Sequence, residues 1–218
     1  MKYSLILLAV FALSCTGTKK EIAGGTSEET NTLARNTQPV VGRDGHSVTA
    51  HAFKDANSYM VSAEYGGKFS VVTEFEISAW LKIDSLPQKS STPHNIIGKF
   101  SDASAALPSE FSLALLNGAC GAEDPAFAFF FTDEYSDFAC EQAILSKNPV
   151  KAGLWTFVKA KWDGRYLTLY QDNVMVAKEE RISAVLPYSQ VPVYFGKSQV
   201  PFAMDGLSFN AGRSYDNK

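Results

Sequence analysis

Residues 155–177, WTFVKAKWDGRYLTLYQDNVMVA, hold the pattern that decides the fold. Two runs of β-forming residues flank Asp163-Gly164, and an Asp-Gly pair between alternating runs is a strong signal for a two-residue hairpin turn. A turn centred on that pair gives the hairpin one apolar face. The pairs expected on this face are Trp162–Arg165, Ala160–Leu167 and Val158–Leu169.

The opposite face of the hairpin is half polar and need not be buried. Its expected pairs are Lys161–Tyr166, Lys159–Thr168 and Phe157–Tyr170. A second turn is expected at Asp172-Asn173, because both residues tolerate positive φ. The pairs that it creates are Met175–Tyr170 and Val176–Leu169. The stretch therefore predicts a three-stranded antiparallel meander.

Short strand-like runs continue along the chain from Val40 onward, with turn residues between them. The clearest is FEISAWLKI at residues 75–83, which alternates strictly and places Trp80 opposite its apolar face. Further strands are expected at 95–100, 111–116, 126–131, 191–195 and 202–210, while 51–60 has the pattern strand, turn, strand. The Phe127, Phe129, Phe131 stripe is expected in the core. Many short strands without a convincing helix indicate an all-β fold, a sandwich or a barrel.

Composition sets broad limits on the protein. The chain has 218 residues, 45% hydrophobic and 12% aromatic, which is ample for the core of one all-β domain. Its formal net charge of -3 argues against nucleic acid or an anionic membrane face as the main partner.

The N-terminus has the features of an export signal. Residues 1–15, MKYSLILLAVFALSC, combine an early lysine with a short apolar run, and residues 12–15 resemble a bacterial lipoprotein box in which Cys15 is lipidated. Ordinary signal-peptidase cleavage is the alternative. Residues 16–39 are polar and are expected to form a flexible tether to a domain at 40–218. This predicts a lipid-anchored protein of the bacterial envelope, at the outer membrane or cell surface.

The other two cysteines, Cys120 and Cys140, bracket one segment of the domain. An exported chain reaches a compartment where disulfides persist, and turn-like residues beside both cysteines favour a bridge between them. The competing interpretation is two buried, reduced cysteines that fill small spaces.

Several short motifs resemble one known family. They are Ala52-Phe53 with Tyr59, FEISAWLK, Leu154-Trp155 through WDG, LYQDN, VYFGKS, and DGLSF at 205–209. Their order and spacing from Val41 to Tyr215 resemble the laminin G-like domains of the concanavalin A-like lectin and glucanase superfamily. The resemblance implies a two-sheet antiparallel jelly-roll outside the cell that binds glycans or proteins, sometimes with calcium at its rim.

Catalytic patterns are weak. Enzymatic relatives in that superfamily carry a Glu-x-Asp-x-x-Glu strand, which this sequence lacks. Glu74 and Glu76 share a strand face with Trp80 and would suit a retaining glycosidase if their carboxyls came within about 5.5 Å. A solvated strand face is the favoured interpretation. No His-Glu-x-x-His or Gly-x-Ser-x-Gly pattern occurs, so no enzyme is predicted.

Acidic residues gather in two loops. Asp133, Glu134 and Asp137 form one group, and Glu123 and Asp124 precede the Phe-rich strand. Several hard oxygen ligands in a loop could hold calcium, but surface loops of acidic proteins have the same composition. No metal ligand and no cofactor is therefore predicted.

Aromatic and basic residues on the predicted outer strand faces are the candidate ligand contacts. Trp80 and Tyr166 could stack on sugar rings while Lys159 supplies hydrogen-bond donors, although such residues also pack beneath loops. The hypothesis is a non-catalytic, lipid-anchored surface protein that recognises glycans. The alternatives are a protein-binding adhesin or envelope scaffold and, less favoured, a divergent glycoside hydrolase.

Overall fold

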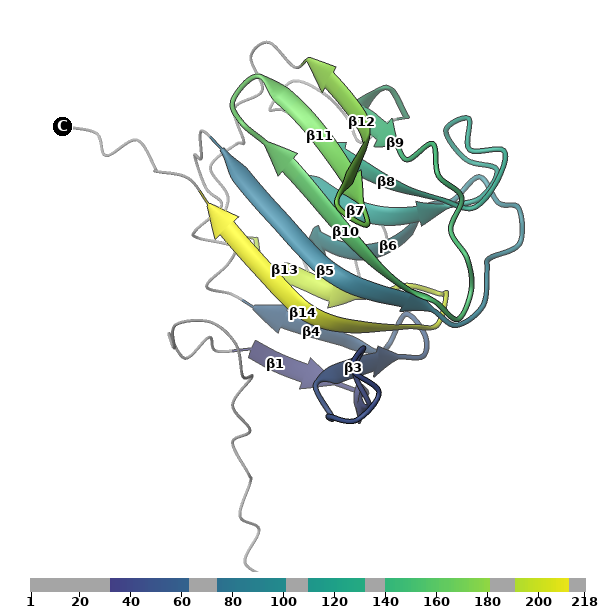
Figure 1. The fold of residues 1–218 in the computed structure, drawn as a ribbon, viewed down its shortest axis with the longest axis vertical. Helices are drawn as coiled ribbons and strands as arrows, with labels where there is room; N and C mark the ends of the chain where they lie inside the picture. The colour runs from purple at the N-terminus through teal and green to yellow at the C-terminus, as the bar shows by residue number, and fades with distance from the viewer. Residues whose placement is uncertain (1–31, 63–73, 101–109, 132–139, 181–190, 212–218) are drawn as a thin grey trace, which may run out of the picture.

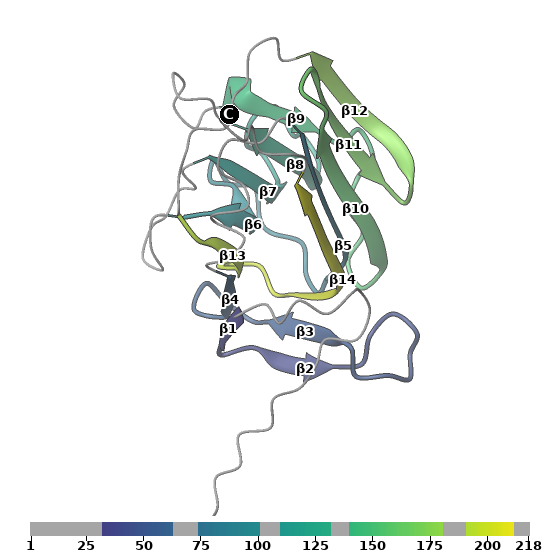
Figure 2. The ribbon, with the colours of Figure 1, turned by 90° about the vertical axis from the view of Figure 1, so that its left-hand side faces the viewer.

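The protein is a jelly-roll sandwich of two antiparallel seven-stranded sheets (Figure 1), as a computed structural model shows. The structure describes residues 32–62, 74–100, 110–131, 140–180 and 191–211. Figure 2 shows the two sheets as facing layers. None of the described helices is long and apolar enough to cross a membrane. The predicted fold class is confirmed.

We call the two layers sheet A and sheet B. Sheet A has the order β1 (Thr32–Arg35), β4 (Tyr59–Ser62), β13 (Val193–Gly196), β6 (His94–Lys99), β7 (Phe111–Leu116), β8 (Ala126–Phe131) and β9 (Ala143–Leu145). Sheet B has the order β12 (Val174–Glu180), β11 (Tyr166–Gln171), β10 (Trp155–Trp162), β5 (Phe75–Ile83), β14 (Phe202–Ala211), β3 (Ala50–Phe53) and β2 (Gln38–Val40). A short 3-10 helix covers Cys140–Gln142.

The strand predictions agree closely with these bounds, but the predicted tether boundary is wrong. β1 and most of β2 fall within residues 16–39, yet β1 pairs with β4 and β2 pairs with β3. Both are edge strands, which are joined to their sheets by backbone hydrogen bonds and need little apolar side-chain burial. Because their sequences are polar, β1 and β2 were not predicted as strands.

The core lies between the sheets. Alternate side chains of β5 and β10 point inward, and Phe75 of sheet B has its ring centre 5.8 Å from that of Phe111 and 5.7 Å from those of Phe129 and Phe131 in sheet A. The predicted stripe on β8 is buried as expected. Each fully buried aromatic side chain of this kind stabilises the fold by about 1.5–3 kcal/mol.

The hairpin between β10 and β11 keeps its predicted faces but not its predicted register. Ala160 pairs with Leu169 and Trp162 with Leu167, a shift of two residues from the expected pairs. The central turn residues are Gly164, with φ of 87°, and Arg165.

Asp163 causes this shift. Its carboxylate accepts hydrogen bonds from the backbone N–H of Arg165 at 3.1 Å and of Tyr166 at 2.7 Å. These bonds, that from Tyr166 above all, lower the pKa of the Asp163 carboxyl. Capped in this way, Asp163 ends the strand rather than occupying the turn centre. Because a two-residue shift preserves alternation, the apolar face is unchanged.

The second turn forms where it was predicted. Asp172 and Asn173 have φ of 51° and 64°, and Met175 pairs with Tyr170. The expected Val176–Leu169 pair is wrong, because a β-bulge makes Ala177 the partner of Leu169.

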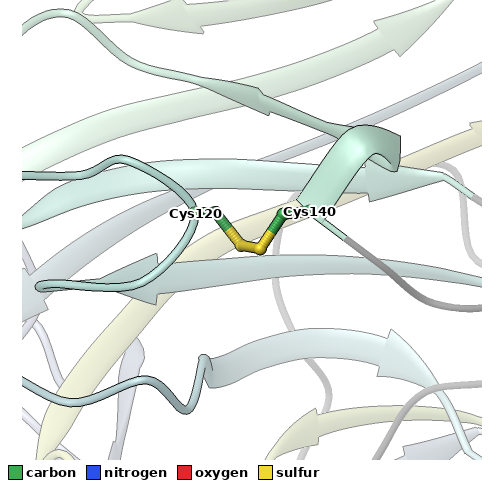
Figure 3. Close-up of a disulfide and its surroundings, with 2 residues drawn as sticks. All are labelled: Cys120 and Cys140. Carbon is green, nitrogen blue, oxygen red and sulfur yellow. A yellow bond between two sulfur atoms is a disulfide. The ribbon is translucent and has the colours of Figure 1, made fainter.

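The predicted disulfide joins Cys120, in the turn after β7, to Cys140 at the start of the 3-10 helix (Figure 3). The two Cα atoms are 5.0 Å apart. Gly118 and Gly121 have φ of 88° and 80°, which permits the sharp turn that carries Cys120 toward its partner.

Candidate functional site

One face of sheet B points away from sheet A and toward the viewer in Figure 1, and we call it the outer face of sheet B. Along β10, half-buried Trp155, Phe157, Lys159 and Lys161 alternate with buried residues that point into the core. Strand pairing arranges the outer side chains in cross-strand rows that follow one another every two residues, roughly 7 Å apart. In order, the rows are Trp155–Lys82–Ala203; Phe157–Trp80–Asp205; Met175–Tyr170–Lys159–Ser78–Ser208; Lys178–Thr168–Lys161–Glu76–Asn210; and Glu180–Tyr166.

Two aromatic rings meet in the second row. The ring centres of Trp80 and Phe157 are 5.3 Å apart, and both side chains are half-buried. The guanidinium carbon of Arg43 lies 4.7 Å from the Trp80 ring centre. This group thus combines apolar ring surface with hydrogen-bond donors.

Asp205 fastens the loop that carries Arg43. Its Oδ2 accepts hydrogen bonds from the backbone N–H of Arg43 at 3.2 Å and from Thr49 Oγ1 at 3.1 Å. Gly42 is required here, since a Cβ at that position would overlap Thr49 and lie 2.6 Å from Asp205 Oδ2. The loop therefore passes closely over the edge of Trp80's row.

Asp44 stabilises the same loop from within. Its Oδ1 accepts hydrogen bonds of 2.9 Å from the backbone N–H groups of His46 and Ser47. Hydrogen bonding by the Ser47 side chain, followed by these backbone bonds, lowers the pKa of Asp44 to about 2. The carboxylate is consequently ionised, and able to accept these bonds, at every ordinary pH.

A β-bulge in β14 lies next to Trp80. The strand register shifts between Asp205 and Ser208, and Gly206 within it has φ of 58°. A Cβ on Gly206 would lie 3.5 Å from Trp80 Cδ1. The bulge thus leaves the indole edge without a neighbouring side chain at this position.

Lys159 lies in the third row, next to Trp80's row. Its Nζ is 4.5 Å from the Tyr170 ring centre and 3.7 Å from Glu76 Oε2. Glu76 pairs across the sheet with Lys161 and Asn210. Its surroundings are those of a solvated strand face, and they do not resemble the paired carboxyls of a glycosidase.

Tyr166 lies at the far end of the outer face. Its ring has Lys178 Nζ at 3.7 Å and Arg165 at 5.1 Å from the ring centre. It sits opposite Asp163, six residues along the chain from Phe157, so about 20 Å separates its row from that of Trp80. The structure therefore brings Trp80 and Lys159 together but leaves Tyr166 outside any single-sugar site that includes Trp80.

Sequence reasoning missed Arg43, Asp205 and Thr49 as parts of this site. Asp205 belonged to a family-like motif, but nothing in its neighbourhood indicated that it would hold a loop more than a hundred residues away in the chain. Arg43 lies in a polar, glycine-containing stretch of the kind found in any surface loop.

One of the two acidic loops, that of Glu123 and Asp124, lies within the described part of the chain. Glu123 and Asp124 are exposed and line a shallow rim pocket of about 410 Å³ with Ser146 and Lys147. No group of three or more metal-ligating side chains occurs among the described residues. Asp133, Glu134 and Asp137 lie outside them, as does Cys15.

Two facing antiparallel sheets place this domain in the jelly-roll class of folds. Residues 54–211 match the laminin G-type profile of the concanavalin A-like lectin/glucanases superfamily, and the chain belongs to this family. The resemblance expected from the sequence is confirmed. A search of the curated proteins finds no sequence match.

Solved structures with the same fold include toxin binding domains. The binding domain of paraclostridial mosquitocidal protein 1 has a TM-score of 0.62 and 13% identity, covering 86% of this chain and 45% of that chain. The ligand-binding domain of botulinum neurotoxin serotype D, in complex with N-acetylneuraminic acid, has a TM-score of 0.62 and 11% identity, covering 84% and 43%. This chain thus spans less than half of these toxin domains, and the likeness shows a shared fold.

Proposed function

We propose that this domain binds glycans without catalysis, through the outer face of sheet B. The observation that carries the proposal is the group formed by Trp80, Phe157 and Arg43, with Asp205 holding the loop above it. Sugars offer apolar C–H faces and hydroxyl groups, so a half-buried ring flanked by fixed polar groups matches both features.

The family and the structural neighbours support a binding role. The neighbours are binding domains of toxins, one of them solved with N-acetylneuraminic acid. The surroundings of Glu76, which has Lys159 at 3.7 Å, give no support to a glycosidase. Binding is therefore the favoured activity, and chemistry on the ligand is not part of the proposal.

A glycan array with the full chain tests this function. Trp80→Ala is expected to weaken binding to every array hit by at least about tenfold, because removing a central aromatic contact commonly costs about 2 kcal/mol. Leu86→Ala, which also trims an exposed apolar side chain, is the matched control and should bind normally. An array without hits, or equal binding by Trp80→Ala and the parent protein, would refute the proposal.

A protein partner is the second candidate, and β12 is the feature that favours it. This strand is an edge of sheet B, and its Val174 and Met175 are 60% and 54% exposed. Exposed apolar side chains on an open edge suit strand addition by a partner. A partner that still binds Trp80→Ala but not Met175→Lys would favour this candidate over the glycan.

We further propose that Cys15 carries a lipid that holds the protein at the bacterial envelope, with the outer membrane or cell surface as its location. The short apolar run that ends in Ala12-Leu13-Ser14-Cys15 supports this. Palmitate labelling of the expressed protein is expected, and Cys15→Ala should abolish it. Persistent labelling of that variant would refute the anchor.

A further inference from the structure

We infer that the glycan is acidic, and that Arg43 and Lys82 bind its carboxylate or sulfate beside Trp80 and Trp155. This inference rests on the proposed function and adds the chemical class of the ligand. Lys82 is two residues from Trp80 on the same face of β5, and it pairs across the sheet with Trp155. The two cations therefore belong to neighbouring rows.

The two tryptophan rings of this region each have a cation of the protein beside them. Arg43 lies 4.7 Å from the Trp80 ring centre, and Lys82 Nζ lies 5.4 Å from that of Trp155. A neutral sugar that stacked on either indole would displace the cation and replace a favourable contact with a similar one. An acidic sugar would instead gain an ion pair with the cation that it meets.

Neither cation has a further strong partner among the described residues. Within the described parts of the chain, neither the Arg43 nor the Lys82 side chain forms an ion pair. By contrast, Lys159 lies 3.7 Å from Glu76, and Arg165 lies 2.7 Å from Glu180. Lys161 and Lys178 of the outer face also form no ion pair among the described residues, but they lie in the row of Thr168. Arg43 and Lys82 are thus the cations without an ion pair that lie beside Trp80 and Trp155.

Two carboxylates of this region, those of Asp205 and Asp172, form hydrogen bonds within the protein itself. Asp205 accepts hydrogen bonds from the Arg43 backbone and Thr49, and Asp172 accepts one of 2.9 Å from the Phe157 backbone. Both therefore act as caps for backbone or loop groups, and the Arg43 guanidinium is turned to the Trp80 ring. An incoming anion meets the guanidinium and the lysine ammonium.

The test is an array of neutral, carboxylated and sulfated glycans, probed with the full chain and three variants. Arg43→Met and Lys82→Met remove a cation but keep an apolar stem, and each should weaken binding to acidic hits about tenfold, as expected for a lost charge-assisted hydrogen bond. Binding to neutral glycans should not fall, because such a ligand no longer has to displace the cation. Lys147→Met, an exposed lysine after β9 in sheet A, is the charge-matched control and should bind normally.

Two further readouts separate charge recognition from a structural role. Arg43→Lys keeps the charge and should retain part of the acidic affinity. The preference for acidic over neutral glycans should disappear at about 1 M salt, where the Debye length is about 3 Å. The carboxylated and sulfated arms show which anion is preferred.

Hits confined to neutral glycans would overturn the inference, as would an equal loss of acidic and neutral binding in Arg43→Met. In both cases the proposed function stands as long as binding depends on Trp80. A complete absence of Trp80-dependent hits would remove the proposed function as well. Acidic hits that lose affinity in both methionine variants, and not in Lys147→Met, would establish the anion site.

Discussion

Sheets A and B have equal strand numbers but differ in what reaches solvent. On β7 and β8 of sheet A every residue is buried, including Ala114, Ala128 and Phe130 on the face turned away from the core. On β10 of sheet B, buried and half-buried residues alternate strictly. A ligand that binds to a sheet face therefore finds side chains on sheet B and a closed layer on sheet A.

The two sheets also differ in how exposed their aromatic rings with cation contacts are. Sheet A has a cluster of Tyr59, Phe100 and Tyr194, with Lys197 Nζ at 4.3 Å from the Phe100 ring centre and 5.0 Å from that of Tyr194. These three rings are only 1–8% exposed. Trp80 has a similar cation contact but is half-buried, so ring access, and not ring–cation contact alone, distinguishes the two faces.

The largest expected effect concerns the buried ion pair of sheet A. Lys99 Nζ lies 2.6 Å from Glu110 Oε2, with the two side chains 0% and 2% exposed, and burial lowers the pKa of Lys99. Glu110→Gln leaves that cation without its carboxylate and should lower the free energy of unfolding by about 3–5 kcal/mol, measured by urea denaturation.

The matched control for this variant is Glu180→Gln in sheet B. Glu180 forms an exposed ion pair with Arg165, which solvent screens, so little change is expected. Replacing both partners, as Lys99→Met with Glu110→Leu, should recover much of the loss in sheet A. Equal effects in the two sheets would contradict the contrast between them.

The disulfide is expected to have the next largest effect. It ties the turn after β7 to the segment before β9, next to the small buried cluster on the far face of sheet A. Closing a loop of 20 residues stabilises the fold by about 3 kcal/mol in the chain-entropy model. The double variant Cys120→Ala with Cys140→Ala should show this loss in thermal or urea unfolding. Unchanged stability would mean that the bridge is absent from the purified protein.

Enlarging one side chain on each outer face compares the faces directly. Ala128→Leu inserts volume into the closed layer of sheet A and should destabilise by about 1–3 kcal/mol. Ser208→Leu makes a comparable enlargement on the outer face of sheet B, where Ser208 is exposed, and should have a much smaller effect. Melting temperatures of the two variants give the result, and a tolerated Ala128→Leu would show that sheet A is not closed there.

The smallest expected effect comes from acid. Hydrogen bonds lower the pKa of Asp44 from 3.8 to about 2, so its contribution to the loop over Trp80 is complete above 3.8 and is lost as the pH falls toward 2. Glycan affinity should therefore not fall between pH 8 and pH 5 through this group. Asp44→Asn at neutral pH should weaken binding slightly, and a steep loss of affinity near pH 6 in the parent protein would point to a different group.

Sequence reasoning succeeded where the pattern within a single strand determines which side chains are buried. The alternation in 75–83 predicted both faces of β5, and the Phe stripe predicted the inner face of β8. It did not predict the burial of Ala128 and Phe130, because the residues that pack with them on this face come from the turn after β7 and from β9, and the sequence pattern does not show that these segments lie there. It likewise missed edge strand β1, since pairing through backbone groups leaves little trace in side-chain hydrophobicity.

Some residues of the candidate site could be predicted from the sequence and others could not. Alternation identified Trp80 and Lys159, because it shows which side chains of β5 and β10 point to the outer face. Tyr166 was grouped with them on the same grounds, but alternation does not give the distance along a strand. Asp205, with the loop that it holds, was not predictable, since its contact with Arg43 joins two distant segments.

The most direct test of the ligand face uses the three tryptophans of the chain as internal probes. Trp80 and Trp155 lie on the outer face of sheet B, whereas Trp162 of the same sheet is buried in the core at 3% exposure. Nitrogen–proton NMR spectra with and without a glycan identified on the array would follow the three indole Nε1–H signals. The account predicts saturable shifts of the Trp80 and Trp155 signals with the Trp162 signal unchanged. Binding that leaves Trp80 and Trp155 unshifted would contradict it.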